Sequence, residues 1–121
     1  MQYQTRRVVM YSHLNSAGVL FGGQALAWID EESGIFAACQ LDTTRIVTKK
    51  MSEVEFKNPA NLGDILSIGA EVVRVGRTSL TVKCEIRNRT TNKVIVNVDE
   101  VVFVSLDENN KPVPHKLFNN A

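Results

Sequence analysis

Residues 15–34 read NSAGVLFGGQALAWIDEESG, a polar, glycine-containing loop that turns into an apolar segment. The adjacent glycines Gly22 and Gly23 mark the change. From Phe21 to about Cys39 the composition is rich in Ala, Leu, Trp, Ile and Glu and lacks proline, which predicts one helix of about five turns. Because apolar residues lie on most sides of this helix, we expect the rest of the protein to enclose it.

A short strand is predicted ahead of the helix, and after residues 41–43 apolar and polar residues alternate with a period of two, which favours strands. The length of the last predicted strand indicates a bulge near Asp99 and Glu100. The tail after it holds two of the three prolines and is expected to be irregular. The predicted strands are Tyr3–Met10, the segment around Val54 and Phe56, Asp64–Val75, Ser79–Arg87 and Val94–Leu106.

Short links between successive strands require a largely antiparallel sheet, since parallel strands need longer crossover connections. A helix that is apolar nearly all round then needs a curved sheet wrapped about it. We therefore predict an α+β fold, an antiparallel sheet of about five strands around one long central helix, as a single domain over residues 1–121. The open edge of such a sheet favours pairing with a second copy of the chain.

The charge balance does not point to nucleic acid, because 14 basic residues are matched by 13 acidic ones. No segment approaches the roughly 20 apolar residues of a membrane helix, and the start of the chain has no apolar run of signal-peptide length. We expect a cytoplasmic protein with neither a nucleic-acid nor a membrane partner.

The cysteines and histidines give no metal-binding pattern. Cys39 and Cys84 lie in apolar stretches, and we interpret them as small buried hydrophobic residues in a reducing compartment, with a disulfide as the minor alternative. His13 and His115 are far apart in the sequence, and neither cysteine has ligand spacing, so no metal is expected.

Gly22 and Gly23 allow two interpretations. They can permit tight packing of the helix start against another backbone. Alternatively, they can leave the first amides of the helix uncovered, and free N–H groups at the positive end of a helix suit a carbonyl oxygen that gains negative charge. The residues alone do not decide between these two.

Asp30 is the most conspicuous polar residue of the predicted helix, because it follows the apolar pair Trp28 and Ile29. An acidic strip of Asp30, Glu31 and Glu32 facing solvent is possible, but three adjacent helical positions span about 200 degrees. At least one acid must therefore turn inward, and we expect Asp30 to do so.

Asp30 follows Gly23 by seven residues, which places the two on one helix face but about 10 Å apart along the axis. One reacting carbon atom cannot touch both groups of the same helix. In a two-fold dimer with antiparallel helices, the start of one helix can approach the middle of the other. A site that uses both residues would then be composite.

The ordered set of these motifs resembles the hotdog acyl-CoA thioesterases, in particular the bacterial short- to medium-chain hydrolases and the cytosolic long-chain acyl-CoA hydrolases. The resemblance covers about residues 13–106. Its motifs are Asn15 with Gly18, Phe21–Gly23, Trp28–Glu31, Arg45–Thr48, Glu55–Pro59, Gly63 with Asp64, and Gly76–Ser79.

The resemblance implies the catalytic residues. Asp30 would act as general base or nucleophile, and Asn15 would reach the site from the neighbouring subunit to orient water or substrate. The amide of Gly23 would polarise the thioester carbonyl. The implied assembly is a homodimer with composite sites, gathered into a tetramer or hexamer. Coenzyme A would enter as part of the substrate, with no separate cofactor.

The resemblance also implies the residues that bind the acyl-CoA substrate. They are Gly22, Lys57, Gly76, Arg77, Thr78 and Ser79. Arg77 suits a phosphate oxygen of coenzyme A, although a solvated turn residue is an equal alternative.

Two other functions are compatible with a hotdog fold. A dehydratase would need a histidine paired with an acid, and no histidine lies at helical spacing from Asp30. We expect His13 to be a loop residue without a chemical role. The second alternative is a non-catalytic protein that binds acyl-CoA.

Overall fold

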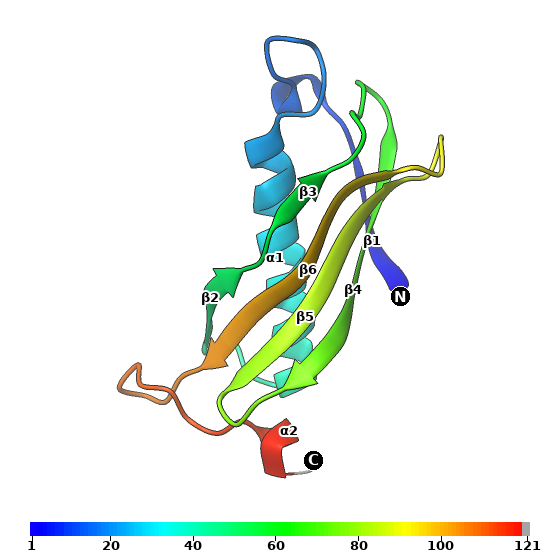
Figure 1. The fold of residues 1–121 in the computed structure, drawn as a ribbon. Coiled ribbons are helices and arrows are strands. Elements are labelled where there is room, and N and C mark those ends of the chain that lie inside the picture. The colour runs from blue at the N-terminus through cyan, green and yellow to red at the C-terminus, as the bar shows by residue number, and fades with distance from the viewer. Residues whose placement is uncertain (120–121) are drawn as a thin grey trace.

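The computed structural model describes residues 1–119, in which six strands form one antiparallel sheet along a helix of 20 residues (Figure 1). A short 3₁₀ turn at Tyr11–His13 precedes that helix. The elements are β1 (Gln2–Val8), α1 (Gly22–Leu41), β2 (Ile46–Met51), β3 (Val54–Phe56), β4 (Ile65–Val75), β5 (Ser79–Asn88), β6 (Val94–Ser105) and α2 (Lys116–Asn119).

The sheet runs in the order β1-β4-β5-β6-β2, with β3 also paired to β6, and every pair of neighbouring strands is antiparallel. This confirms the predicted α+β architecture and the antiparallel sheet. The strand count differs from the prediction of about five, because two short strands, β2 and β3, share one side of β6.

The break between β2 and β3 lies beside a bulge in β6. Val101 of β6 pairs with Val82 while Val98 pairs with Cys84, so two residues of β6 face one residue of β5. This confirms the bulge predicted near Asp99 and Glu100. Ser52 fills the break, since its N–H donates to the carbonyl of Glu100 at 2.8 Å and its hydroxyl accepts the N–H of Glu100 at 3.0 Å.

The hydrophobic core lies between α1 and the concave face of the sheet. On β5 the predicted apolar face is confirmed, because Leu80, Val82, Cys84 and Ile86 are all fully buried, although Thr81 on the other face is buried as well. The residues of α1 that complete the core recur at helical spacing and are Ala25, Trp28, Ile29, Ser33, Ala37 and Leu41.

The prediction that the helix is enclosed is wrong for the single chain. The sheet covers one side of α1, and the opposite side, which we call the outer side, remains open, with Ile35 54% exposed. The prediction for the cysteines fails in the same place, because Cys39 is exposed. Cys84 is buried against the helix, and burial raises the pKa of its thiol to about 12.

The tail is more ordered than predicted. Leu106 forms a β-bridge with Pro112, and the chain then enters α2. His115 is only 4% exposed and ties this segment to the sheet. For residues 120–121 the prediction lies outside the described residues. Within residues 1–119, no helix combines the length and apolarity needed to cross a membrane.

Candidate functional site

The first amides of α1 are available as hydrogen-bond donors. Phe21 is the N-cap, and its carbonyl accepts the N–H groups of Gln24 at 3.0 Å and Ala25 at 3.1 Å. Among the residues that the structure describes, no acceptor takes the N–H of Gly22 or Gly23. These two groups lie at the positive end of the helix dipole, where an oxygen that gains negative charge is stabilised.

The glycines also have a packing role, although their neighbours are aromatic rings and not another backbone. A Cβ on Gly23 would lie 2.6 Å from Cε1 of Phe21, and a Cβ on Gly22 would lie 3.4 Å from Cε1 of Phe56. The packing interpretation therefore holds only in a changed form, against rings and not against another backbone, and the free amides remain compatible with the second interpretation. A side chain at position 23 would displace the Phe21 ring and cover the free amide.

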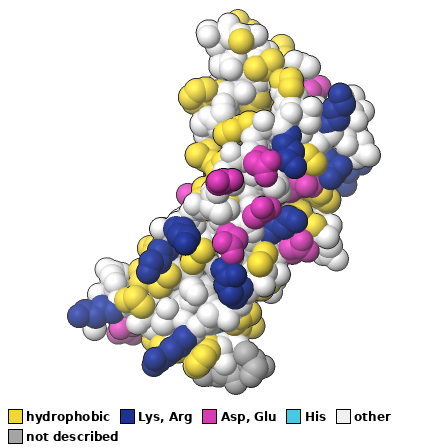
Figure 2. Space-filling view, viewed as in Figure 1, with side chains coloured by type: hydrophobic (Ala, Val, Ile, Leu, Met, Phe, Trp, Pro, Cys, Tyr) yellow, Lys and Arg dark blue, Asp and Glu magenta, His cyan; other side chains and the backbone are white. Residues whose placement is uncertain are grey.

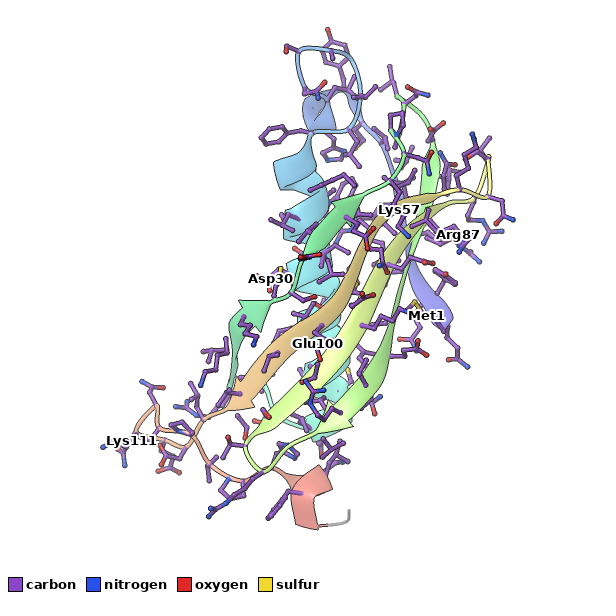
Figure 3. All side chains as sticks on the ribbon, viewed as in Figure 1. Met1, Asp30, Lys57, Arg87, Glu100 and Lys111 are labelled. Atoms are coloured by element: carbon purple, nitrogen blue, oxygen red, sulfur yellow. The ribbon has the colours of Figure 1, made fainter. Side chains whose placement is uncertain are left out.

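Gly22 and Lys57 line the same pocket, of about 240 Å³, beside the start of α1. Its remaining lining residues are mostly apolar: Leu20, Ala25, Phe56, Asn58, Pro59, Ala60, Ile95 and Val96. Figure 3 places Lys57 at the end of β3 nearest this part of the helix. The structure thus brings together two of the residues that the resemblance assigns to substrate binding.

Asp30 lies on the outer side of α1 and is exposed, which corrects the expectation that it turns inward. Its carboxylate is held from β2, because the hydroxyl of Thr48 donates to Oδ1 at 2.7 Å. Figure 3 shows Asp30 projecting from the helix toward β2. No hydrogen bond to the second oxygen, Oδ2, occurs among residues 1–119.

The acid that does turn inward is Glu32, whose side chain is 11% exposed. It accepts hydrogen bonds from Oγ1 of Thr5 at 2.9 Å and from Nη2 of Arg7 at 3.0 Å. Arg7 also pairs with Glu31 and lies 5.3 Å from the centre of the Trp28 ring. A partly buried carboxylate needs a cation, and β1 supplies one beside Glu32 and not beside Asp30.

A second pocket, of about 290 Å³, opens beside Asp30 between α1 and β2. Thr48 lines it together with the apolar side chains of Ile35, Ile46 and Phe103. Thr48 was not predicted as a site residue, although it belongs to one of the motifs that carry the resemblance. The proximity of Thr48 to Asp30 follows only from the position of β2 beside the middle of α1, which the sequence does not show.

Asn15 lies in the loop before α1 and is exposed. Its Oδ1 accepts the N–H groups of Ala17 at 2.9 Å and Val19 at 3.2 Å, so the carbonyl end of the side chain is fixed by the loop. The Nδ2 amide group donates to no acceptor among residues 1–119. Gly18 completes the loop with a φ of 81°, a conformation that favours glycine.

His13 has a structural use. Its Nδ1 accepts the N–H of Met10 at 3.0 Å, and its ring packs edge-on against Trp28 with centroids 4.9 Å apart. Among the described residues, no group of three or more His, Cys, Asp or Glu side chains is arranged to hold a metal ion.

The turn from Gly76 to Ser79 lies at the opposite end of the sheet from the start of α1 (Figure 1). The side chain of Arg77 is exposed and forms no ion pair within residues 1–119. Within one chain, the structure therefore does not bring this turn together with Gly22, Gly23 or Lys57.

An antiparallel sheet packed along one long helix is the arrangement of the hotdog class. The family model of the thioesterase superfamily matches residues 17–95. The chain belongs to this superfamily, as the sequence resemblance predicted, and the prediction of a thioester-hydrolysing enzyme is confirmed.

Individual relatives agree with this membership. The chain is 33% identical over 112 residues to an uncharacterized acyl-CoA thioester hydrolase of Zymomonas mobilis, an alignment that covers 88% of this chain and 73% of that protein. It is 32% identical to one of Bacillus subtilis, over 83% of this chain and 59% of that protein.

Solved structures confirm the hotdog fold. A hexameric hotdog fold thioesterase of Campylobacter jejuni superposes with a TM-score of 0.81 at 33% identity, over 93% of this chain and 89% of the other. An acyl-CoA hydrolase of Staphylococcus aureus in complex with butyryl coenzyme A gives 0.82 at 31% identity, over 92% and 66%.

Proposed function

We propose that this chain is an acyl-CoA thioesterase that hydrolyses fatty acyl-CoA to the free acid and coenzyme A. The observation that carries the proposal is the Asp30 carboxylate, which Thr48 holds by one oxygen at the mouth of a partly apolar pocket. The other oxygen is left to act on a water or a carbonyl carbon. Relatives named as acyl-CoA thioester hydrolases support the choice of substrate class.

In the proposed reaction, the N–H of Gly23 donates to the thioester oxygen as negative charge develops there. Along one route, Asp30 takes a proton from water, the water oxygen bonds to the carbonyl carbon, and the C–S bond breaks. The thiolate of coenzyme A then takes the proton. Along the other, an oxygen of Asp30 bonds to the carbon, the thiolate leaves, and water hydrolyses the resulting anhydride.

The site is proposed to be composite, because Gly23 and Asp30 of one helix lie about 10 Å apart along its axis. Two antiparallel α1 helices would place the helix start of one chain beside Asp30 of the other. The free Nδ2 group of Asn15 would come with that helix start. The exposed outer side of α1 and the free edge of β2 are available for such contact.

The same antiparallel arrangement supports the proposed groove for coenzyme A. It would place the partner's turn at the end of the sheet where Gly22 and Lys57 line their pocket. Arg77 on that turn would bind a phosphate oxygen of the nucleotide. Hydrophobic side chains gather around the upper end of the face shown in Figure 2, where α1 begins, which suits an acyl chain or a second copy. Further assembly of dimers into a tetramer or hexamer is part of the proposal.

The decisive experiment is hydrolysis of acyl-CoAs of increasing chain length by the wild type and Asp30→Ala, measured by thiol release beside thermal unfolding. We expect Asp30→Ala to fold normally and to lose turnover. Near-normal turnover would refute the mechanism, and joint loss of folding and turnover would indicate a structural role. A wild type that binds acyl-CoA without hydrolysing it would be a binding protein instead.

A further inference from the structure

The turn that joins β4 to β5 is not of a type that loops of its length usually adopt. Gly76 faces Ser79 across the hairpin, which leaves a loop of two residues, Arg77 and Thr78. Loops of two residues strongly prefer turn types in which at least one residue has a positive φ. Neither Arg77 nor Thr78 has a positive φ. The shape of this turn therefore depends on contacts from elsewhere in the chain.

Those contacts come from the segment after β6. The carbonyl of Arg77 accepts the backbone N–H of His115 at 3.3 Å, and the carbonyl of Thr78 accepts the backbone N–H of Ser105 at 2.9 Å. The carbonyl of Ser79 lies 2.7 Å from Nε2 of His115. Three successive carbonyls are thus held from residues 105–115, and His115 holds two of them.

The hydrogen bonds define the state of the His115 ring. A carbonyl oxygen only accepts, so the contact with Ser79 requires a proton on Nε2. Nδ1 in turn accepts the N–H of Phe118 at 3.3 Å. The ring is buried and joins α2 to the turn through one donating and one accepting nitrogen.

We propose that His115 is a positioning residue for the substrate: it fixes the backbone of the turn so that the guanidinium of Arg77 faces the phosphates of coenzyme A. The inference rests on the proposed function, in which this turn binds the nucleotide. Its physical basis is that an exposed, flexible arginine binds a phosphate well only when its backbone is already in place. The His115 side chain is buried, so in this proposal it acts through the turn and does not contact the substrate itself.

The test compares three substitutions that remove different parts of the ring. Glutamine at position 115 can place an N–H donor where Nε2 stands, whereas the shorter side chain of asparagine brings its amide only to the place of Nδ1. We expect His115→Ala and His115→Asn to raise KM for acyl-CoA about three- to tenfold with kcat nearly unchanged. His115→Gln should keep KM for acyl-CoA close to the wild-type value. Lys116→Ala, an exposed neighbour, serves as the matched control and should behave as wild type.

A truncated substrate, the same acyl group on pantetheine without the nucleotide, separates positioning from general damage. On it, all His115 variants should match the wild type. Equal damage on both substrates, or equal KM values for His115→Gln and His115→Asn, would overturn the inference. If His115→Ala fails to fold, the comparison of the Gln and Asn variants still decides the question.

Arg77→Ala separates failure of this inference from failure of the proposed groove. Loss of one charge-assisted contact at an exposed site should raise KM for acyl-CoA roughly tenfold and leave acyl-pantetheine unaffected. If Arg77→Ala does not raise KM for acyl-CoA more than KM for acyl-pantetheine, the proposed groove is wrong, independently of the results for His115. If the groove stands, the double variant with His115→Ala should resemble Arg77→Ala alone, because the positioned group is gone. Full additivity would contradict positioning.

Discussion

The two sides of α1 differ in almost every physical respect. The side that faces the sheet carries Trp28 and Ile29, is buried, and is complete within one chain. The outer side carries Asp30 and Ile35 and is exposed, and among the described residues β2 borders it at Asp30. Successive residues of one helix, Ile29 and Asp30, therefore belong to two different environments.

Folding and the proposed chemistry therefore depend on different sides of one helix. The packed side contributes the burial of apolar surface that stabilises the fold. The outer side holds an acid that contributes little to stability, because its only bond within residues 1–119 is the exposed one with Thr48. Substitutions at neighbouring positions should accordingly separate stability from activity.

The largest effects are expected from the pair Ile29→Ala and Asp30→Ala. Ile29→Ala removes a fully buried side chain and should lower the free energy of unfolding by about 2–5 kcal/mol, while the molecules that remain folded keep their turnover. Asp30→Ala should lower kcat roughly 10²–10⁴-fold, the range of general acid–base catalysis, with little change in unfolding temperature. Denaturant unfolding and thiol-release kinetics on the same samples measure both.

The contrast between the two sides of α1 would fail if either variant lost both stability and kcat, or if the two effects were exchanged. A large fall in stability for Asp30→Ala would mean that the outer side is structural. A large fall in kcat for folded Ile29→Ala would mean that the packed side positions the chemistry. Kinetics must be measured well below the unfolding temperature of each variant, so that loss of folded protein is not counted as loss of turnover.

The next prediction tests whether the site on the outer side of α1 is formed by residues of two chains. If Asn15 and Asp30 act from different chains, the Asn15→Ala and Asp30→Ala homodimers should both turn over poorly. Mixed dimers retain one intact site in two, so co-refolding equal amounts should restore up to about a quarter of the wild-type activity. Absence of complementation, with mixed dimers demonstrated by differential tagging, would place each site within one chain.

Much of the fold could be predicted because its signals are local. The alternation on β5 and the length of α1 follow from periodicity, and the bulge near Asp99 follows from the length of β6. The division of the edge beside β6 into two strands, β2 and β3, could not be predicted. It depends on the hydrogen bonds between Ser52 and Glu100, which are far apart in the sequence. Order in the tail likewise depends on the distant contact between His115 and Ser79.

The candidate site was predicted less completely, for a similar reason. Residue types marked Asp30 as unusual, but its orientation depends on which neighbouring strand supplies a cation. Arg7 on β1 binds Glu32 on the side that faces the sheet, whereas Asp30 is bound by Thr48. The periodicity of the helix does not predict these contacts, because both partners come from strands. The exposure of Cys39 was missed because an apolar composition does not show which side of a helix the sheet covers.

A smaller effect should come from Thr48, which supports the acid without being able to replace it. Thr48→Val removes the hydroxyl that donates to Oδ1 of Asp30 and keeps the shape of the side chain. We expect kcat to fall about three- to tenfold, because an exposed hydrogen bond to a charged group contributes about 1 kcal/mol. KM and the unfolding temperature should change little, and Thr48→Ser should retain most of the activity. A Thr48→Val enzyme as inactive as Asp30→Ala would give Thr48 a direct role in the chemistry.

The smallest functional effect is expected at the cysteines, which report on the same two sides of α1. Cys39 lies on the outer side and is exposed, whereas Cys84 faces the packed side and is fully buried. Burial raises the pKa of Cys84 to about 12, so its thiol stays protonated and unreactive from neutral pH up to about pH 10. In the native protein, iodoacetamide should modify Cys39 and spare Cys84, and urea should expose both. Modification should leave turnover nearly unchanged, because Cys39 lies more than two turns beyond Asp30 along the helix. Mass spectrometry of the two peptides measures the outcome.

If Cys39 reacts only after unfolding, a second copy covers that end of the outer side in solution. If Cys84 reacts in the native protein, the packed side opens more readily than the burial of its side chains allows, and the contrast between the two sides fails.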